Sequence, residues 1–207
     1  MFTRTLARPA ALAAALTAAL VVSACAGADH PTVAHDPSAA TGSPGAAVSA
    51  SFGAADVMFA QMMIPHHQQA VEMSGLAETR AADPEVKRLA GQVKAAQAPE
   101  IATMTGWLAA WGRPAPSANA GHGMPGMDHG MSGMMSEAEL AKLAAASGTD
   151  FDRQFLTLMI AHHEGAITMA EEEIADGVHP DATALARQIV TTQQGEIDAM
   201  RKLLGRL

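Results

Sequence analysis

Apolar and polar residues follow one another along much of this chain with the period of an amphipathic helix. In one stretch, about residues 54–80, the residues of the apolar seam are spaced by alternating steps of three and four. They are Asp56, Phe59, Met63, His66, Ala70 and Met73, and the same six residue types recur ninety-six positions later at Asp152, Phe155, Met159, His162, Ala166 and Met169. A second stretch, about residues 85–110, has a similar stripe. This spacing predicts helices that each bury one face.

The chain therefore contains an internal duplication, whose offset holds without a gap from Asp56 and Asp152 to Leu108 and Leu204. Each copy also has a proline dipeptide, Asp83-Pro84 or His179-Pro180, that predicts a turn between two helices. Neither hairpin can cover its own apolar seam. We therefore expect an all-α fold, a four-helix bundle built from two duplicated hairpins. Aromatic content is only 3%, and no alternating β-branched run indicates strands.

The composition along the chain predicts three regions. They are a lipoprotein signal peptide (1–24), a flexible tether rich in Ala, Gly, Ser and Pro (25–51) and the bundle domain (52–207). Within the bundle domain we expect repeat 1 (52–111), a Met/His-rich loop with a short helix (112–148) and repeat 2 (149–207). Ser136 and Glu139 have the spacing of a capping box that opens this short helix.

The first residues have the features of a secretion signal. Arg4 and Arg8 are followed by an apolar stretch at 10–22 that is short for a membrane span. The stretch ends in Val-Ser-Ala-Cys, which resembles the lipobox of bacterial lipoproteins, and Cys25 is the only cysteine. We expect lipidation at Cys25 and an extracytoplasmic protein anchored to the cell membrane. The alternative is an ordinary cleaved signal peptide with a spare thiol.

Charge and cysteine content narrow the classes of ligand. The formal net charge is −8, which argues against nucleic acid as a partner and suits a protein that binds cations. One cysteine can form neither an internal disulfide nor a cysteine-based zinc site. A metal would have to be bound by histidine, methionine, carboxylate or amide groups.

The residues that stayed identical in the two repeats are weighted to these ligand types. The candidate metal ligands of the bundle are His66, His67, His162, His163, Met63, Met73, Met159, Met169, Glu100, Glu196, Met104 and Met200. A buried imidazole needs partners for both nitrogens, so keeping two adjacent histidines in each repeat suggests a use. Each glutamate lies on an apolar stripe and is expected to be a direct ligand or an acceptor that orients a histidine. The alternatives are methionines that only fill the core and a His-Glu bond that only fixes helix register.

Two prolines distinguish the repeats. Pro65 and Pro99 fall inside predicted helices beside candidate ligands, whereas their counterparts are Ala161 and Gly195. An interior proline removes a backbone hydrogen bond and commonly kinks a helix. We therefore expect the two half-sites to differ in shape.

The segment between the repeats offers a second set of soft ligands. It contains His122, Met124, Met127, His129, Met131, Met134 and Met135 in a glycine-rich stretch that we expect to be flexible and exposed. Thioether and imidazole groups select copper, above all Cu(I), and also Ag(I). This segment is interpreted as a capture arm for copper, with a plain linker as the alternative.

Together these motifs resemble a known family. The duplicated Met-Ile-(Pro/Ala)-His-His, the Gln-x-x-Glu-Ile-x-x-Met of the second helices and the Met-rich segment between them are similar to the ferritin-like family known as domain of unknown function 305. The resemblance covers about residues 52–207. It implies a secreted or membrane-anchored helical bundle, and some relatives are associated with copper binding and tolerance.

The sequence thus favours a lipoprotein that binds copper for sequestration, tolerance or delivery, with silver as a mimic and an unidentified protein partner for metal transfer. No catalytic motif is present, so an enzyme is not expected. One alternative is a ferritin-like redox enzyme with two iron or manganese ions, although no Glu-x-x-His motif occurs. The other is a structural bundle that binds no metal.

Overall fold

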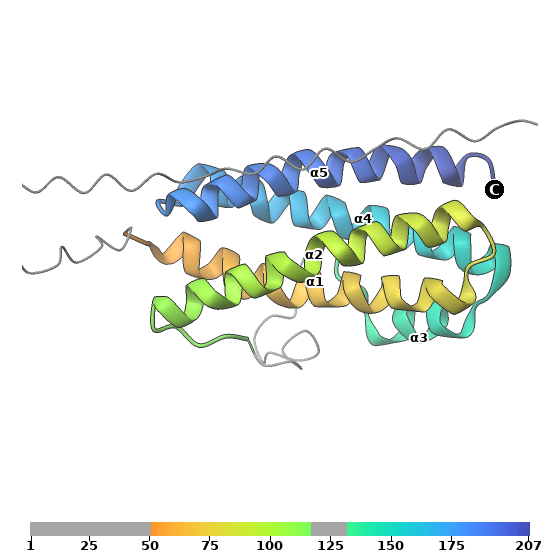
Figure 1. Cartoon of the computed structure of the whole chain (residues 1–207), viewed down its shortest axis with the longest axis horizontal. Coiled ribbons are helices and arrows are strands. Elements are labelled where there is room, and N and C mark those ends of the chain that lie inside the picture. Colours follow the sequence, from red (N-terminus) through yellow and green to blue (C-terminus); the bar gives the residue numbers. More distant parts are fainter. Residues whose placement is uncertain (1–50, 117–131) are drawn as a thin grey trace, which may run out of the picture. The chain divides into compact units, whose positions relative to one another are not determined.

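The computed structural model describes residues 51–116 and 132–207. These residues form five helices and no strand: α1 (Ala54–Arg80), α2 (Pro84–Ala110), α3 (Glu137–Ala145), α4 (Gly148–Asp176) and α5 (Pro180–Leu204) (Figure 1). The predicted all-α helical bundle is confirmed. None of these helices is long and apolar enough to span a membrane.

Several predictions concern residues outside the described ranges. They are the signal peptide, the lipidation site at Cys25, nearly all of the tether, and the loop residues His122, Met124, Met127, His129 and Met131.

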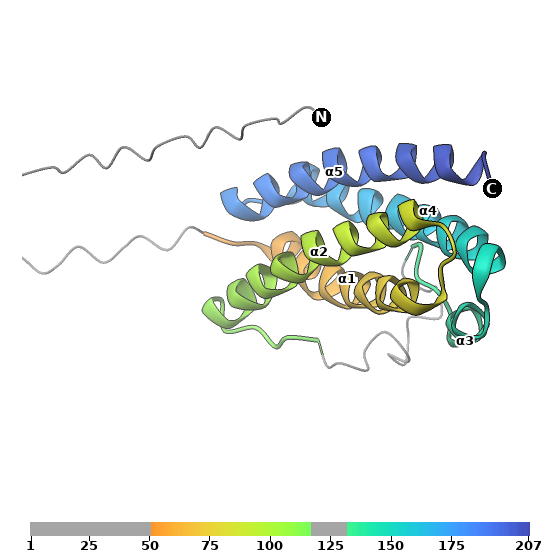
Figure 2. The same cartoon turned by 45° about the vertical axis from the view of Figure 1, so that its right-hand side comes forward.

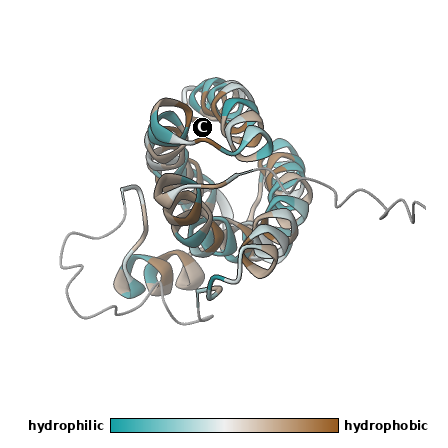
Figure 3. Cartoon of the chain, turned by 90° about the vertical axis from the view of Figure 1, so that its left-hand side faces the viewer, coloured by the Kyte–Doolittle hydropathy of each residue, from teal (hydrophilic) through white to brown (hydrophobic). Residues whose placement is uncertain are grey.

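The four long helices form two hairpins, one from each repeat. Helix α1 packs against α2, α4 packs against α5, and the hairpins meet mainly through α1 and α4 (Figures 1 and 2). The short helix α3 lies outside these four and contacts α1 and α4. An end-on view shows hydrophobic and hydrophilic residues on every long helix, as expected of helices with one buried face (Figure 3).

The helix ends follow the predicted signals. Helices α2 and α5 both begin at the proline of the predicted turns. The Asp83 carboxylate accepts a hydrogen bond from the backbone N–H of Glu85 at 2.7 Å, which caps α2. At the start of α3, Glu139 accepts from the backbone N–H of Ser136 at 2.9 Å, and the Ser136 hydroxyl accepts from the N–H of Glu139 at 3.3 Å. The predicted capping box is therefore confirmed.

A reciprocal pair of buried aspartates joins the repeats. Asp152 at the start of α4 accepts hydrogen bonds from the backbone N–H groups of Ala82 and Asp83, in the turn between α1 and α2. Asp56 at the start of α1 does the same for Val178 and His179, in the turn between α4 and α5. Each hairpin turn is thus satisfied by a carboxylate of the other repeat, which makes α1 and α4 antiparallel.

The buried apolar side chains form two clusters that the duplication relates to each other. One contains Phe59, Met63, Met104, Ala166 and Met169, and the other contains their counterparts Phe155, Met159, Met200, Ala70 and Met73. Each cluster therefore combines residues from both repeats. This sharing explains why a single hairpin would leave its seam uncovered.

Both interior prolines are accommodated within helices. Pro65 lies inside α1 and Pro99 inside α2, and each helix runs continuously for 27 residues. Pro65 is buried, and its counterpart Ala161 is exposed. A difference in shape between the two half-sites stays a prediction.

Candidate metal centre

Two histidines from different repeats meet where α1 faces α4. The ring centroids of His66 and His162 are 3.7 Å apart with an interplanar angle of 37°. Both side chains are completely buried. His66 and His162 occupy equivalent positions in the two repeats. Their contact therefore lies at the pseudo-twofold axis that relates one repeat to the other.

The second histidine of each repeat is held by the glutamate of its own hairpin. His67 Nε2 lies 2.6 Å from the Glu100 carboxylate, and His163 Nε2 lies 2.8 Å from the Glu196 carboxylate. Both imidazoles are fully buried, and the glutamates retain slight exposure. This geometry matches the expected acceptor that orients a histidine. An ionised carboxylate accepts from Nε2–H and leaves Nδ1 with a lone pair.

Buried ring nitrogens without partners are the most informative feature of this region. His66 Nε2 lies 3.2 Å from the backbone carbonyl oxygen of Ser132. The Nδ1 atoms of His66, His67, His162 and His163 have no hydrogen-bond partner, and His162 Nε2 also has none. Leaving a buried polar atom unpaired is costly in the absence of a ligand or water. Nitrogen lone pairs are therefore available for coordination in both repeats.

The central histidines are neutral at ordinary pH. Burial, with repulsion from His67 as a smaller cause, lowers the pKa of His66 to about 3. Burial and the neighbouring histidines also hold the pKa of His162 well below its usual range. Neutral imidazole is the form that coordinates a metal, so no proton has to be displaced from these rings at neutral pH.

The six candidate methionines of the bundle are all buried. They fall into two related groups: Met63, Met104 and Met169 in one core cluster, and Met159, Met200 and Met73 in the other. The antiparallel pairing of α1 with α2 through His67 and Glu100 places Met63 opposite Met104, one helical turn further along. Met63 and Met73 thus share a helix face, as predicted, but they contribute to different clusters.

Within residues 51–116 and 132–207, no three His, Cys, Asp or Glu side chains are grouped so that they could hold a metal ion. The four histidines therefore do not form a complete ligand set by themselves. A metal bound by one or two of these imidazoles would need thioether or amide ligands to complete its coordination. Such mixed nitrogen and sulfur sets favour soft ions.

Two glutamines belong to the duplicated motif but were not among the candidate ligands. Gln97 and Gln193 are buried, and both amide atoms of Gln97 and the amide oxygen of Gln193 lack partners. Each glutamine lies one helical turn from the glutamate of its repeat. Their identity in both repeats was the signal that could have identified them.

The expectation that the whole Met-rich loop is exposed is wrong at its end. Met135 is only 8% exposed and belongs to the core cluster that contains Met159. The reason is a pair of hydrogen bonds that fixes its backbone: the Gln69 side-chain amide donates to the Met135 carbonyl at 2.9 Å and accepts from its N–H at 2.7 Å. Met134 is half-buried.

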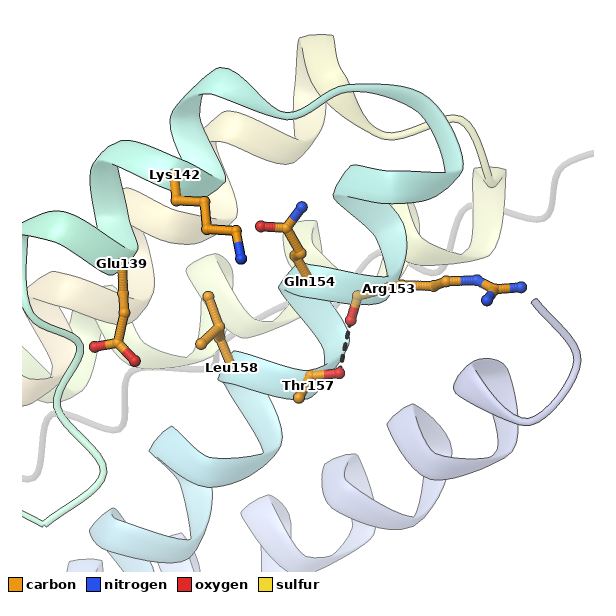
Figure 4. Close-up of a pocket in the computed structure, with 6 residues that line it drawn as sticks. All are labelled: Glu139, Lys142, Arg153, Gln154, Thr157 and Leu158. Atoms are coloured by element: carbon orange, nitrogen blue, oxygen red, sulfur yellow. Dashed lines mark hydrogen bonds between the residues drawn. The ribbon is translucent and has the colours of Figure 1, made fainter.

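A shallow depression of about 310 Å³ lies between α3 and α4, away from the candidate ligands. Its lining residues are Glu139, Lys142, Arg153, Gln154, Thr157 and Leu158 (Figure 4). Thr157 donates its hydroxyl proton to the Arg153 carbonyl. The candidate centre is a buried contact between helices and not this open pocket.

The fold and the centre define a four-helix bundle with histidines and methionines in its core. Residues 56–204 match the model of the family described as Domain of unknown function (DUF305). The chain belongs to this family, and the predicted family membership is confirmed. The ferritin-like relationship stays a prediction. No curated protein matches the chain.

Solved structures of the same fold carry substantial sequence identity. A DUF305 protein from Streptomyces coelicolor is 39% identical, with a TM-score of 0.66, over 73% of this chain and 93% of that chain. A DUF305 fragment from Deinococcus radiodurans is 36% identical, with a TM-score of 0.66, over 75% of this chain and 99% of that one. CopM in its Cu(II)-bound form is 35% identical, with a TM-score of 0.63, over 73% of this chain and 96% of that solved chain. CopM has also been solved with Cu(I) and with Ag bound.

Proposed function

We propose that this protein is an extracytoplasmic lipoprotein that binds copper, as Cu(I) or Cu(II), for sequestration, tolerance or delivery. The observation that carries the proposal is the set of four buried Nδ1 atoms without partners, next to six buried thioethers. The similarity to CopM, which binds Cu(II), Cu(I) and Ag, supports copper as the cargo and silver as its mimic.

The ligand assignment follows from which atoms are already engaged. His67 and His163 have Nε2 bound to a glutamate, so each coordinates through Nδ1, alongside the central pair His66 and His162, whose Nδ1 atoms also have no partner. The carboxylate at Nε2 fixes the ring and raises the basicity of the opposite nitrogen. Met63 and Met104 lie one turn from the first of these pairs, and Met159 and Met200 lie one turn from the second. A neutral imidazole with neutral thioethers is a soft donor set, which favours Cu(I) over Zn²⁺ or Fe²⁺.

Metal analysis after equal exposure of the purified protein to Cu, Zn, Fe and Ag tests the choice of metal. Copper and silver should be retained in preference to zinc and iron. Substituting Leu for Met63 and Met104 keeps the volume of the core but removes two thioethers, so Cu(I) stoichiometry or affinity should fall. Met58→Leu is the matched control because Met58 is also on α1 but is 56% exposed. Equal copper retention by the Met63/Met104 double variant and by the Met58→Leu control would contradict thioether ligation.

We further propose that the Met/His-rich loop captures Cu(I) independently of the bundle. Changing Met124, Met127 and Met131 to Leu should lower Cu(I) stoichiometry and leave the helical circular dichroism unchanged. Met135 is excluded from this test because it is part of the core. Unaltered Cu(I) uptake would mean that the loop is a linker.

The anchor is tested separately from the metal. Cys25→Ser should release the protein from the membrane or block its maturation, since Cys25 is the proposed lipidation site. Mass spectrometry of the N-terminal peptide should detect the lipid in the parent protein, which retains Cys25. Unchanged membrane fractionation together with no lipid mass on Cys25 would exclude the anchor without affecting the copper proposal.

A further inference from the structure

The last residues of the Met/His-rich loop, just before α3, pack closely against the bundle. We use the name strap for residues 132–135, from Ser132 to Met135. The Gln69 amide on α1 holds the strap by two hydrogen bonds to the backbone of Met135, at 2.7 and 2.9 Å. The side chain of Met135 is buried in the core. The strap is therefore a fixed part of the bundle.

Two glycines allow the strap to approach α4. A Cβ atom on Gly165 would lie 2.0 Å from the Ser132 carbonyl oxygen, and a Cβ atom on Gly133 would lie 2.5 Å from the Ala161 carbonyl oxygen. Gly133 also has a φ of 78°, which other residues rarely adopt. No side chain larger than hydrogen fits at either position with the strap in place.

The duplication shows that these adaptations serve the strap. Gly165 on α4 and Gln69 on α1 are equivalent positions in the two repeats. On α1 this position holds the strap by its amide, and on α4 the same position has no side chain, which leaves room for the strap. Glycine in the middle of a helix is destabilising by about 0.5–1 kcal/mol relative to alanine. The close approach of the strap explains why glycine stands at position 165 in spite of this loss of helix stability.

The first residue of the strap, Ser132, contacts the central histidine His66. The Ser132 carbonyl oxygen lies 3.2 Å from His66 Nε2. A carbonyl can only accept a hydrogen bond, so His66 must carry its proton on Nε2 and its lone pair on Nδ1. Glu100 and Glu196 impose the same arrangement on His67 and His163. His162, the counterpart of His66, has no partner on either nitrogen.

We propose that the strap is a positioning element that fixes His66 as the Nε2–H tautomer and so presents its Nδ1 to the metal. The Ser132 main-chain carbonyl thereby does for His66 what Glu100 and Glu196 do for His67 and His163. His66 and His162 become inequivalent, because the strap carbonyl bonds to His66 alone. The metal-binding consequence rests on the proposed function, whereas the tautomer of His66 does not.

The first experiment displaces the strap with Gly165→Ala. The matched control is Gly195→Ala, also within a long helix, where an added Cβ meets nothing within 4 Å. Nitrogen-15 NMR of the metal-free protein should show His66 as the Nε2–H tautomer in the parent and in Gly195→Ala. In Gly165→Ala the His66 pattern should shift towards a mixture of tautomers, and Cu(I) affinity at the bundle should fall by about 10- to 100-fold.

A second variant guards against a general loss of folding. Gly133→Ala disturbs the strap from outside the helices, and Gly112→Ala is its control, because Gly112 has a φ of 64° but an added Cβ there meets nothing within 4 Å. A His66 tautomer that is the same in the glycine variants and their controls would overturn the proposal. A changed tautomer with undiminished Cu(I) affinity would instead contradict the ligand role of His66 and leave copper binding by the protein intact, whereas no Cu(I) binding by the parent would contradict the proposed function itself.

Discussion

The two repeats agree at the positions that face the centre and differ at positions around it. His66 and His67 correspond to His162 and His163, and each hairpin has its own His-Glu pair. The differences include Gln69 against Gly165, which the strap explains, and Ala77 against Glu173. The pattern separates two requirements. The imidazoles and thioethers are needed twice, whereas residues around them can differ, as Gln69 and Gly165 do where they contact the single strap.

Glu173 shows the second asymmetry most clearly. It is almost completely buried in α4 and faces Asp56, whereas its counterpart Ala77 leaves Asp152 without such a neighbour. Burial, reinforced by the charge of Asp56, raises the pKa of Glu173 to about 8. Backbone N–H groups lower the pKa of Asp56 against the effect of its burial. Repeat 2 therefore contains a neutral carboxyl group at neutral pH that repeat 1 lacks.

The largest expected effect comes from removing what the repeats share. His66→Ala combined with His162→Ala should remove the bundle metal site, because the central imidazoles are contributed by both repeats. Copper should raise the melting temperature of the parent by mass action but not that of the double variant. The two proteins should be compared over the same copper titration. An identical rise in both would mean that these histidines are core residues, and the bundle assignment would fail.

A tenfold to hundredfold effect is expected from either glutamate. Glu100→Gln and Glu196→Gln should each weaken copper binding by about 10- to 100-fold, because the amide cannot supply the negative charge that orients and polarises the histidine. Glu78→Gln is the control, since Glu78 is exposed and bonded to Lys94. Competition with a copper chelator measures the change. Markedly unequal losses would show that the half-sites differ in affinity, as the prolines beside them suggest.

Acid should destabilise the metal-free protein through the centre itself. The pKa of His66 is lowered to about 3 from 6.5, so the folded state resists protonation while the unfolded chain accepts it. The stability contributed by this group is therefore complete above pH 6.5 and is lost as the pH falls towards 3. The lowered pKa of His162 makes stability fall with decreasing pH in the same way. Urea unfolding as a function of pH should show this decline, and the His66/His162 double variant should show less of it.

The smallest effect is expected from Glu173 and lies on the alkaline side. Its folded pKa of about 8 exceeds 4.5, so its contribution to stability is complete below pH 4.5 and is lost as the pH rises through 8. Glu173→Gln keeps the shape and can donate a hydrogen bond to Asp56 without ionising. The variant should therefore lose less stability than the parent between pH 5 and 9. Equal losses would place the origin of the alkaline sensitivity elsewhere.

Much of this architecture was predictable because it depends on local period and on the duplication. The seam spacing, the Asp83-Pro84 turn and the capping box at Ser136 each have a local physical cause, and each was found where predicted. The burial of Met135 was not predictable, because it depends on an amide at Gln69 that is distant in sequence. The roles of Gly165 and Glu173 were hidden for the same reason. Glu173 continues the seam spacing four residues after Met169, and Gly165 lies beside the seam, but only tertiary packing brings Glu173 to Asp56 and Gly165 to the strap.

The reciprocal aspartates make folding of the two halves interdependent. A fragment ending after α2 would keep the turn at Ala82 and Asp83 but lose Asp152, the acceptor for its backbone N–H groups. Asp56 in the same fragment would have no turn of a second hairpin to bind. The protein is in this sense a covalently joined dimer of hairpins, and its halves should recover structure when they are mixed but not when each is alone.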